Sequence, residues 1–317
     1  MDNIDNVNIQ TSAKTLRILE LLRDKSMRLV DVAEAMDMSK SAAYNHLSTL
    51  HELGYVDKVE KEYRNVADQS VRVNPRSMLS LITTLHDQDG CSVSDLAQET
   101  GFAERTVERW LADFEEGGYV VSDGEEYHVG LRFLEIGGAR RRQIRLHEAA
   151  LKKVHELANE SGELVNLLTE ENGMGVYLHQ AYGDQGPKLD VHPGFRCPLN
   201  TTALGKAILA YLSDERVDEI VETHGLPAVN ENTITDREIL DEERATIRER
   251  GYAIDDEERL NGLRCIAVPI TNDDGEILGA VSISAPVSRM KGKRFEQTIP
   301  ELVQEGANLI ELNINYS

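Results

Sequence analysis

The sequence is poor in aromatic residues and cysteine, and it has no long hydrophobic run. Aromatic residues make up 5% of the 317 positions, and the apolar stretches are short, as at residues 207–212. A helix that crosses a bilayer needs about 20 apolar residues in succession, so the sequence excludes a membrane span. The three cysteines are odd in number and widely spaced, which predicts neither a disulfide framework nor a zinc cluster. Residues 1–10 are polar and carry no export signal, so we expect a cytoplasmic protein.

Basic residues are also scarce, since 34 Lys and Arg face 56 Asp and Glu, for a formal charge of -22. A surface this negative repels nucleic acid at ordinary salt. The carboxylates are spread along the chain, as in proteins adapted to molar salt, where the Debye length falls to about 3 Å and only close contacts persist. We therefore hypothesise a halophilic protein. Better folding in dilute buffer than in molar KCl would contradict this hypothesis.

An internal repeat lies in the first half of the chain. A shift of 64 residues superposes residues 29–56 on residues 93–120 without a gap, with seven identities. A further helical pattern precedes each copy, and a short hairpin pattern follows it. Each unit therefore has the order helix, helix, turn, helix, hairpin, which is the winged helix-turn-helix pattern. We predict two such units, at residues 12–65 and 74–130.

The third helix of the first unit has a distinct outward face. Apolar spacing turns Ala43, Leu47 and Leu50 inward, with Ser39 as the N-cap and Gly54 at the end. The outward side chains can donate to phosphates or base edges, and none is acidic. We predict that this unit binds double-stranded DNA through helix and hairpin residues Ser39, Lys40, Ser41, Tyr44, Asn45, Ser48, Lys58, Lys61 and Arg64. The alternative is a solvated face that happens to lack carboxylates.

The second unit differs at the corresponding helix, where Glu104 and Glu108 lie outward beside Arg105 and Arg109. Residues 65–138 hold 5 basic and 14 acidic residues. These carboxylates would repel the phosphate backbone of DNA. We expect the second unit to be a spacer, a dimerisation module or a weak second reader, in which Arg105 and Arg109 are the candidate DNA contacts.

A helical stripe in residues 146–158 predicts a linker helix region at residues 131–161. The region contains four arginines that either bind the DNA backbone or pair with carboxylates, namely Arg140, Arg141, Arg142 and Arg145. Residues 162–317 then alternate between short β patterns and helical patterns. Turn chemistry at Asn172-Gly173 predicts a hairpin. Thr235 and Glu238 predict a capping box for a helix that ends at Gly251.

The C-terminal pattern predicts an α+β domain with an antiparallel sheet. Pleating places Ser282 and Ser284 on the same face of one strand. Two hydroxyls on a half-buried strand are suited to a small polar ligand, although strand serines are more often satisfied by backbone or water.

Five ordered segments resemble the IclR family of transcriptional regulators, and the resemblance covers nearly the whole chain. The segments are SKSAAYNHLSTLHELGYV, YHVGLRFLEIG, NTTALGKAILA, RERGYAIDDEERLNGLRCIAVPI and GAVSISAPVSRM. The resemblance implies a dimer or a dimer of dimers, a winged helix in the major groove, and a GAF-like α/β domain whose bound metabolite, often a carboxylate or aromatic acid, alters operator affinity. Carried over by motif, it implies a ligand pocket at Leu189, Cys197, Ala203, Leu204, Asp255, Cys265, Ser282 and Ser284. Family members usually have one winged unit, whereas this sequence has two.

We therefore predict a DNA-binding transcriptional regulator that responds to a small-molecule effector. We expect a homodimer or homotetramer without cofactor, metal or membrane attachment. One alternative is a ligand-sensing protein-interaction module with degenerate winged helices, which the acidic second unit fits. A thiol enzyme built on Cys265 and a histidine lacks any motif that orients the pair.

Overall fold

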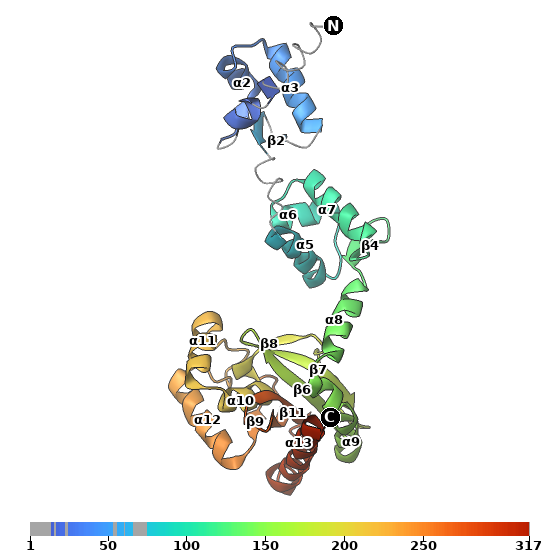
Figure 1. Ribbon diagram of the computed structural model, residues 1–317, viewed down its shortest axis with the longest axis vertical. Coiled ribbons are helices and arrows are strands. Elements are labelled where there is room, and N and C mark those ends of the chain that lie inside the picture. Colours follow the sequence, from blue (N-terminus) through green and yellow to red (C-terminus); the bar gives the residue numbers. More distant parts are fainter. Residues whose placement is uncertain are drawn as a thin grey trace. The chain divides into compact units, whose positions relative to one another are not determined.

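The structure is a computed structural model that describes residues 14–15, 17–22, 25–52, 56–59, 61–65 and 75–316. The chain divides into two compact units, residues 1–135 and residues 136–317. Figure 1 shows their helices and strands.

The described part of the first 65 residues contains helical segments and a small sheet. Residues 17–21 are helical, and the other elements are α2 (Leu29–Ala35), α3 (Lys40–Glu52), β1 (Met27–Arg28), β2 (Val56–Val59) and β3 (Glu62–Asn65). The strands pair in the order β1-β3-β2. Ser39 Oγ accepts a hydrogen bond from the Ala42 backbone N–H at 3.2 Å, so Ser39 caps α3 as predicted. The predicted helix end at Gly54 lies outside the described residues.

Residues 75–129 have the same order of elements. They form α5 (Pro75–Asp87), α6 (Val93–Thr100), α7 (Glu104–Glu116), β4 (Val120–Ser122) and β5 (Tyr127–Val129). The pairing repeats at the shift seen in the sequence, because Met27 pairs with Tyr63 and Cys91 pairs with Tyr127. Each set of helices closes around its own apolar core. The sequence repeat is therefore also a repeat of strand register.

The C-terminal unit is built on one six-stranded antiparallel sheet in the order β8-β7-β6-β11-β10-β9. The strands are β6 (Leu164–Glu171), β7 (Met174–Tyr182), β8 (Arg196–Pro198), β9 (Ala253–Asp256), β10 (Leu263–Thr271) and β11 (Ile277–Pro286). The helices are α8 (Arg132–Arg142, which begins in the first unit), α9 (Arg145–Ser161), η1 (Leu199–Thr201), α10 (Ala203–Tyr211), α11 (Asp214–His224), α12 (Arg237–Arg250), the π-helical turn η2 (Arg294–Thr298) and α13 (Ile299–Tyr316). The predicted mixture of helices with an antiparallel sheet is confirmed.

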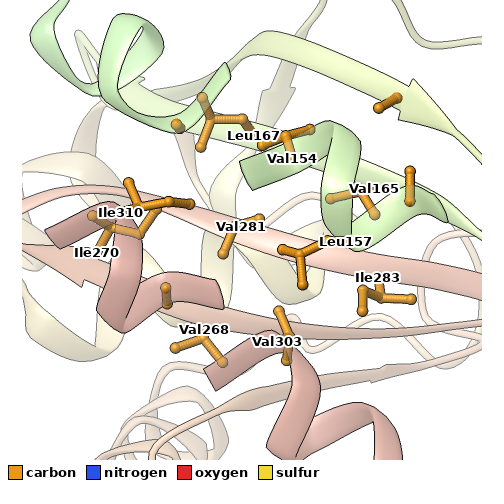
Figure 2. Packing of buried hydrophobic residues seen from close by; sticks show 14 of the residues in the cluster. Val154, Leu157, Val165, Leu167, Val268, Ile270, Val281, Ile283, Val303 and Ile310 are labelled. Carbon is orange, nitrogen blue, oxygen red and sulfur yellow. The ribbon is translucent and has the colours of Figure 1, made fainter. Parts of the chain in front are cut away.

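Both faces of this sheet are covered. On one face, Val281 and Ile283 of β11 pack with α9 and α13, and Figure 2 shows Val154 and Leu157 of α9 in this cluster. The opposite face packs against α10, with α11 and α12 contributing to the same core. Because side chains alternate along a strand, each strand supplies one set of residues to each layer. The sheet therefore separates two apolar cores.

Two sequence expectations are changed by this packing. The predicted linker region is two helices, and α9 belongs to the core of the C-terminal unit, because its apolar stripe is buried against the sheet. The predicted Thr235–Glu238 capping box is wrong. Asp236 is the N-cap of α12, and its carboxylate accepts from the backbone N–H groups of Glu238 and Ile239 at 2.8 and 3.1 Å. Among the described residues, no helix is long and apolar enough to span a bilayer.

Candidate functional site

A small cavity lies on the α10 face of the sheet. Its empty volume is about 280 Å³, which includes its opening to solvent. It is lined by Asn166, Tyr177, Leu189, Thr202, Ala203, Leu204, Asp255, Arg259, Leu263, Cys265, Ser282 and Ser284. Polar groups thus face a mainly apolar space, which is the usual composition of a small-molecule site.

Strand register brings the polar residues together. Cys265 of β10 pairs with Ser284 of β11 on one side and with Asp255 of β9 on the other, so the three form a row across the sheet. Next to this row, Ser282 pairs with Asn166 of β6. The predicted common face of Ser282 and Ser284 is therefore present. Ile283 lies between the two serines and Val281 precedes them, and both face the other core.

Seven of the eight ligand residues implied by the resemblance line the cavity. Cys197 does not, although it is buried in the core on the same face. Sequence reasoning missed Asn166, Tyr177, Thr202, Arg259 and Leu263. Arg259 stands within the quoted motif RERGYAIDDEERLNGLRC, so its charge was visible in the sequence, but its approach to the cavity was not.

One wall of the cavity is the start of α10. Thr202 caps this helix, since its hydroxyl oxygen accepts from the Gly205 N–H at 2.9 Å. A Cβ on Gly205 would lie 2.0 Å from the Leu199 carbonyl oxygen, so only glycine fits where α10 meets η1. The cap and the close approach fix Ala203 and Leu204 at the cavity.

A buried ion pair connects α10 to the turn between β9 and β10. Lys206 of α10 is 1% exposed, and its Nζ lies 2.6 Å from Glu258 Oε1 and 3.7 Å from Glu243 Oε1. Glu258 precedes Arg259 in the connection between β9 and β10. Asp255 Oδ1 accepts from the Glu258 N–H at 2.8 Å, which closes the turn. The position of Arg259 therefore depends on Lys206 and Asp255.

The polar groups at the cavity differ in charge and in their partners. Burial, together with nearby Glu258, raises the pKa of the Asp255 carboxyl to about 6. Arg259 stacks over the Phe195 ring at 5.4 Å and lies 3.3 Å from the exposed carboxylate of Asp190. Ser282 Oγ is buried, and the described residues offer it no hydrogen-bond partner. The cavity thus combines one cation, one partly neutralised acid and a hydroxyl without a partner.

The thiols do not support nucleophilic chemistry. Burial and the neighbouring Asp255 raise the pKa of Cys265, and burial raises the pKa of Cys197 to about 11. Both thiols are therefore protonated at neutral pH, and a thiol is a far weaker nucleophile than a thiolate. Among the described residues, no group of three or more His, Cys, Asp or Glu side chains is arranged to hold a metal ion.

A second candidate surface is the outward face of α3. Ala43, Leu47 and Leu50 are buried, whereas Tyr44 is 51% exposed. The predicted residues Ser39, Lys40, Ser41 and Asn45 are exposed and Ser48 is half-buried. This arrangement presents hydroxyl, amide and ammonium groups along one side of the helix, as a helix that enters a groove of DNA requires.

The predicted DNA contacts in the hairpin of β2 and β3 differ in their exposure. Lys58 and Lys61 are exposed, and Lys58 Nζ lies 5.6 Å from the centre of the Tyr63 ring. Arg64 is half-buried and forms an ion pair with Asp57 at 3.0 Å. On α7, Arg105 and Arg109 are exposed between the exposed carboxylates Glu104 and Glu108. The face of α3 is therefore the less acidic of the two.

Two family models match parts of this chain. The model of the IclR helix-turn-helix domain matches residues 12–60, and the model described as bacterial transcriptional regulator IclR C-terminal matches residues 140–312. The chain belongs to the IclR family. It is therefore related to DNA-binding transcriptional regulators, and α5–β5 lies between the two matched regions.

Individual IclR relatives agree with this assignment. The chain is 29% identical over 240 residues to the probable regulator ArcR of Halobacterium salinarum, covering 74% of this chain and 91% of that one. It is 31% identical over 224 residues to the repressor IclR of Escherichia coli, covering 69% and 82%. The crystal structure of an IclR homolog from Microbacterium hydrocarbonoxydans, complexed with 4-hydroxybenzoate, has the same fold with a TM-score of 0.64 at 21% identity, covering 76% and 100%. The matched families and relatives are regulators, not enzymes.

Replacing Lys206 by Met tests the ion pair between Lys206 and Glu258. The change leaves Glu258 buried without its cation, so we expect the free energy of unfolding to fall by about 3–5 kcal/mol. Lys152→Met, at an exposed ion pair with Glu156 on α9, is the matched control and should cost less than about 1 kcal/mol. Denaturant unfolding of both variants measures the difference, and equal losses would show that Lys206 is not a structural tie.

Asp255 gives a pH-dependent prediction. Its folded pKa of about 6 lies above the ordinary value of 3.8, so ionisation opposes folding. The contribution of Asp255 to stability is therefore present below pH 4 and lost as the pH rises to 6, by about 3 kcal/mol. Asp255→Asn keeps the oxygen that accepts from Glu258 and should remove this loss. Unfolding free energies of both proteins at pH 4.5 and 7.5 check it; parallel pH profiles would contradict it.

Proposed function

We propose that this IclR-family regulator reads double-stranded DNA through α3 and adjusts its DNA affinity to a small metabolite bound in the cavity. The observation that carries the proposal is the exposed face of α3, where Lys40, Ser41, Tyr44 and Asn45 lie outward over a buried apolar stripe. Between Lys40 and His51 this helix has no carboxylate. The face can therefore approach phosphates and base edges although the whole chain is acidic.

We propose that residues 12–65 and 74–130 are two winged helix-turn-helix units and that the first makes the main DNA contacts. The shared order of elements and the shared Met27–Tyr63 and Cys91–Tyr127 pairing support the duplication. The exposed Glu104 and Glu108 of α7 argue against equal contact by the second unit. In molar salt, where repulsion reaches only about 3 Å, the acidic second unit would not prevent binding by the first.

We further propose that residues 162–317 are a GAF-like sensor domain of a cytoplasmic homodimer or homotetramer, joined to the winged units through residues 131–161. Leu131, Leu134 and Ile136 at α8 are 81%, 70% and 49% exposed, which suits contact with a second copy. A dimer would place two reading heads on two half-sites of an operator.

The cavity favours a small carboxylate effector. Arg259 supplies a cation, and Ser282 Oγ supplies a buried hydroxyl without a partner. The homolog from Microbacterium hydrocarbonoxydans is complexed with 4-hydroxybenzoate, which is a carboxylate of this kind. A carboxylate that pairs with Arg259 would gain charge-assisted hydrogen bonds inside a mainly apolar site.

The sheet offers a route from the cavity to the linker region. Ser282 and Ser284 face the cavity, whereas Val281 and Ile283 of the same strand pack with α9 on the other face. A ligand that shifts β11 would therefore change the packing of α9. Such a change alters DNA affinity only if the effector binds the two arrangements of α9 unequally.

A pair of charge reversals tests the DNA assignment. Lys40→Glu should lower affinity for an operator fragment by about tenfold or more, because it places a carboxylate against phosphate. Arg105→Glu, the same change on α7, should leave affinity within about twofold. Mobility shifts of fragments found by genomic footprinting measure both variants in low and molar KCl. The reverse pattern would assign DNA reading to α7.

Substitution of Arg259 tests the effector assignment. Arg259→Leu should weaken binding of 4-hydroxybenzoate or an aliphatic carboxylate by about 10- to 100-fold, because a charge-assisted bond of about 1.5–3 kcal/mol is lost. Arg196 of β8 forms an exposed ion pair with Glu171 of β6 and provides the control. The variant Arg196→Leu should bind the ligand as the unchanged protein does. Calorimetric titration gives each Kd. Equal affinities in all three proteins would exclude Arg259 from the site.

A further inference from the structure

The corner between α8 and α9, residues 140–148, carries a concentration of positive charge. It contains four arginines and one carboxylate, that of Glu148, in a chain with a charge of -22. Many other arginines of this unit pair with carboxylates, as Arg216 and Arg289 do at 2.9 and 2.6 Å. The corner arginines form no such pair with described residues. Arg141 and Arg145 instead donate to the carbonyls of Leu178 and Ile314, at 3.4 and 2.7 Å.

Two nitrogen atoms of this corner are buried without a partner among the described residues. They are Arg141 Nε, which always carries a hydrogen, and His147 Nε2, which carries one in one of the two neutral tautomers. His147 is 7% exposed, so solvent does not replace the missing partner. A buried donor left unsatisfied costs about 1–3 kcal/mol, and such groups are rare in folded proteins. Their occurrence together at one corner indicates an acceptor that the chain itself does not supply.

The corner also contains the start of a long helix. α9 has 17 residues, and its N-cap is Ile144, whose side chain makes no capping hydrogen bond. The His147 N–H already donates to the Ile144 carbonyl at 2.9 Å, so the N–H groups left at this helix end are those of Arg145 and Leu146, where the helix dipole favours negative charge. His147 is the third residue of α9. The unpartnered imidazole and the uncapped helix end therefore lie within one turn.

Two further histidines lie beside His147. The His179 ring on β7 lies 5.7 Å from the His147 ring, and its Nε2 is 3.1 Å from His155 Nε2. Burial, His155, His147 and Arg141 lower the pKa of His179 to about 4, and burial and Arg141 lower the pKa of His147. The His147 and His179 imidazoles are therefore neutral at pH 7, and each can donate one N–H.

We propose that the α8–α9 corner is a binding site for a phosphate-type oxyanion, which accepts hydrogen bonds from Arg141 Nε–H and His147 Nε2–H beside the start of α9. The shared chemistry is a tetrahedral oxyanion, and its source is either free phosphate or a backbone phosphate of DNA. Because Arg141 also holds the Leu178 carbonyl of β7, a bound oxyanion joins α8, α9 and the sheet. The site is separate from the effector cavity, since none of these residues lines it.

Thermal unfolding of the full chain with inorganic phosphate tests the site. At constant ionic strength and a phosphate concentration ten times Kd, the midpoint should rise by about 3–5 °C relative to chloride. Arg141→Gln and His147→Leu should each remove this rise, and Arg141→Lys provides a second variant if Arg141→Gln does not fold. Lys152→Gln, an exposed cation of α9 outside the corner, is the control and should keep the rise.

A mobility-shift arm distinguishes the two sources. If the ligand is free phosphate, the midpoint rises and Arg141→Gln binds DNA as Lys152→Gln does. If the ligand is a DNA phosphate, free phosphate has no effect and Arg141→Gln alone weakens DNA binding, by about tenfold. Absence of both effects, or a phosphate response that Arg141→Gln retains, overturns the proposal. Lys40→Glu separates this result from failure of the α3 assignment, because it should weaken DNA binding in either case.

Discussion

The cavity on the α10 face of the sheet depends on the buried ion pair between Lys206 and Glu258. A lysine that is 1% exposed cannot remain charged at low cost unless a carboxylate meets it, and Glu258 Oε1 does so at 2.6 Å. The pair joins α10, one wall of the cavity, to the turn that positions Arg259. Because the turn is also closed by Asp255, the cation and the acid of the cavity are fixed by the same few contacts.

The sheet gives this small site a connection to the rest of the chain. Its strands are buried on both faces, so any displacement of Ser282 or Ser284 also displaces Val281 or Ile283 in the opposite core. Close-packed cores respond to such displacements by changing arrangement as a unit. Because α9 is buried in that core, this helix and the sheet form one packed unit.

The sequence predicts which residues share one face of a helix or strand better than it predicts which other element that face contacts. Periodicity alone placed Ala43, Leu47 and Leu50 inward and set Ser282 and Ser284 on one face. It missed Asn166 and Arg259, because their approach to the cavity depends on strand register and on a turn held by Lys206. The apolar stripe of α9 is visible in the sequence and predicts a linker helix. The stripe does not show which surface it packs against, and in the structure that surface is the sheet. The N-cap of α12 is Asp236 and not Thr235. Both side chains can cap a helix, and residue spacing alone does not decide between two adjacent candidates.

The net charge of -22 would by itself argue against a protein that binds DNA. The arrangement of the charges answers that objection, because contact energies depend on the groups within a few ångströms and salt screens the others. Carboxylates are absent from α3 between Lys40 and His51, and they are outnumbered at the α8–α9 corner. They are abundant on α7, where Glu104 and Glu108 are exposed. Residues 17–65 and residues 75–129 therefore share an order of elements, while a few surface charges make the first segment better suited to DNA than the second.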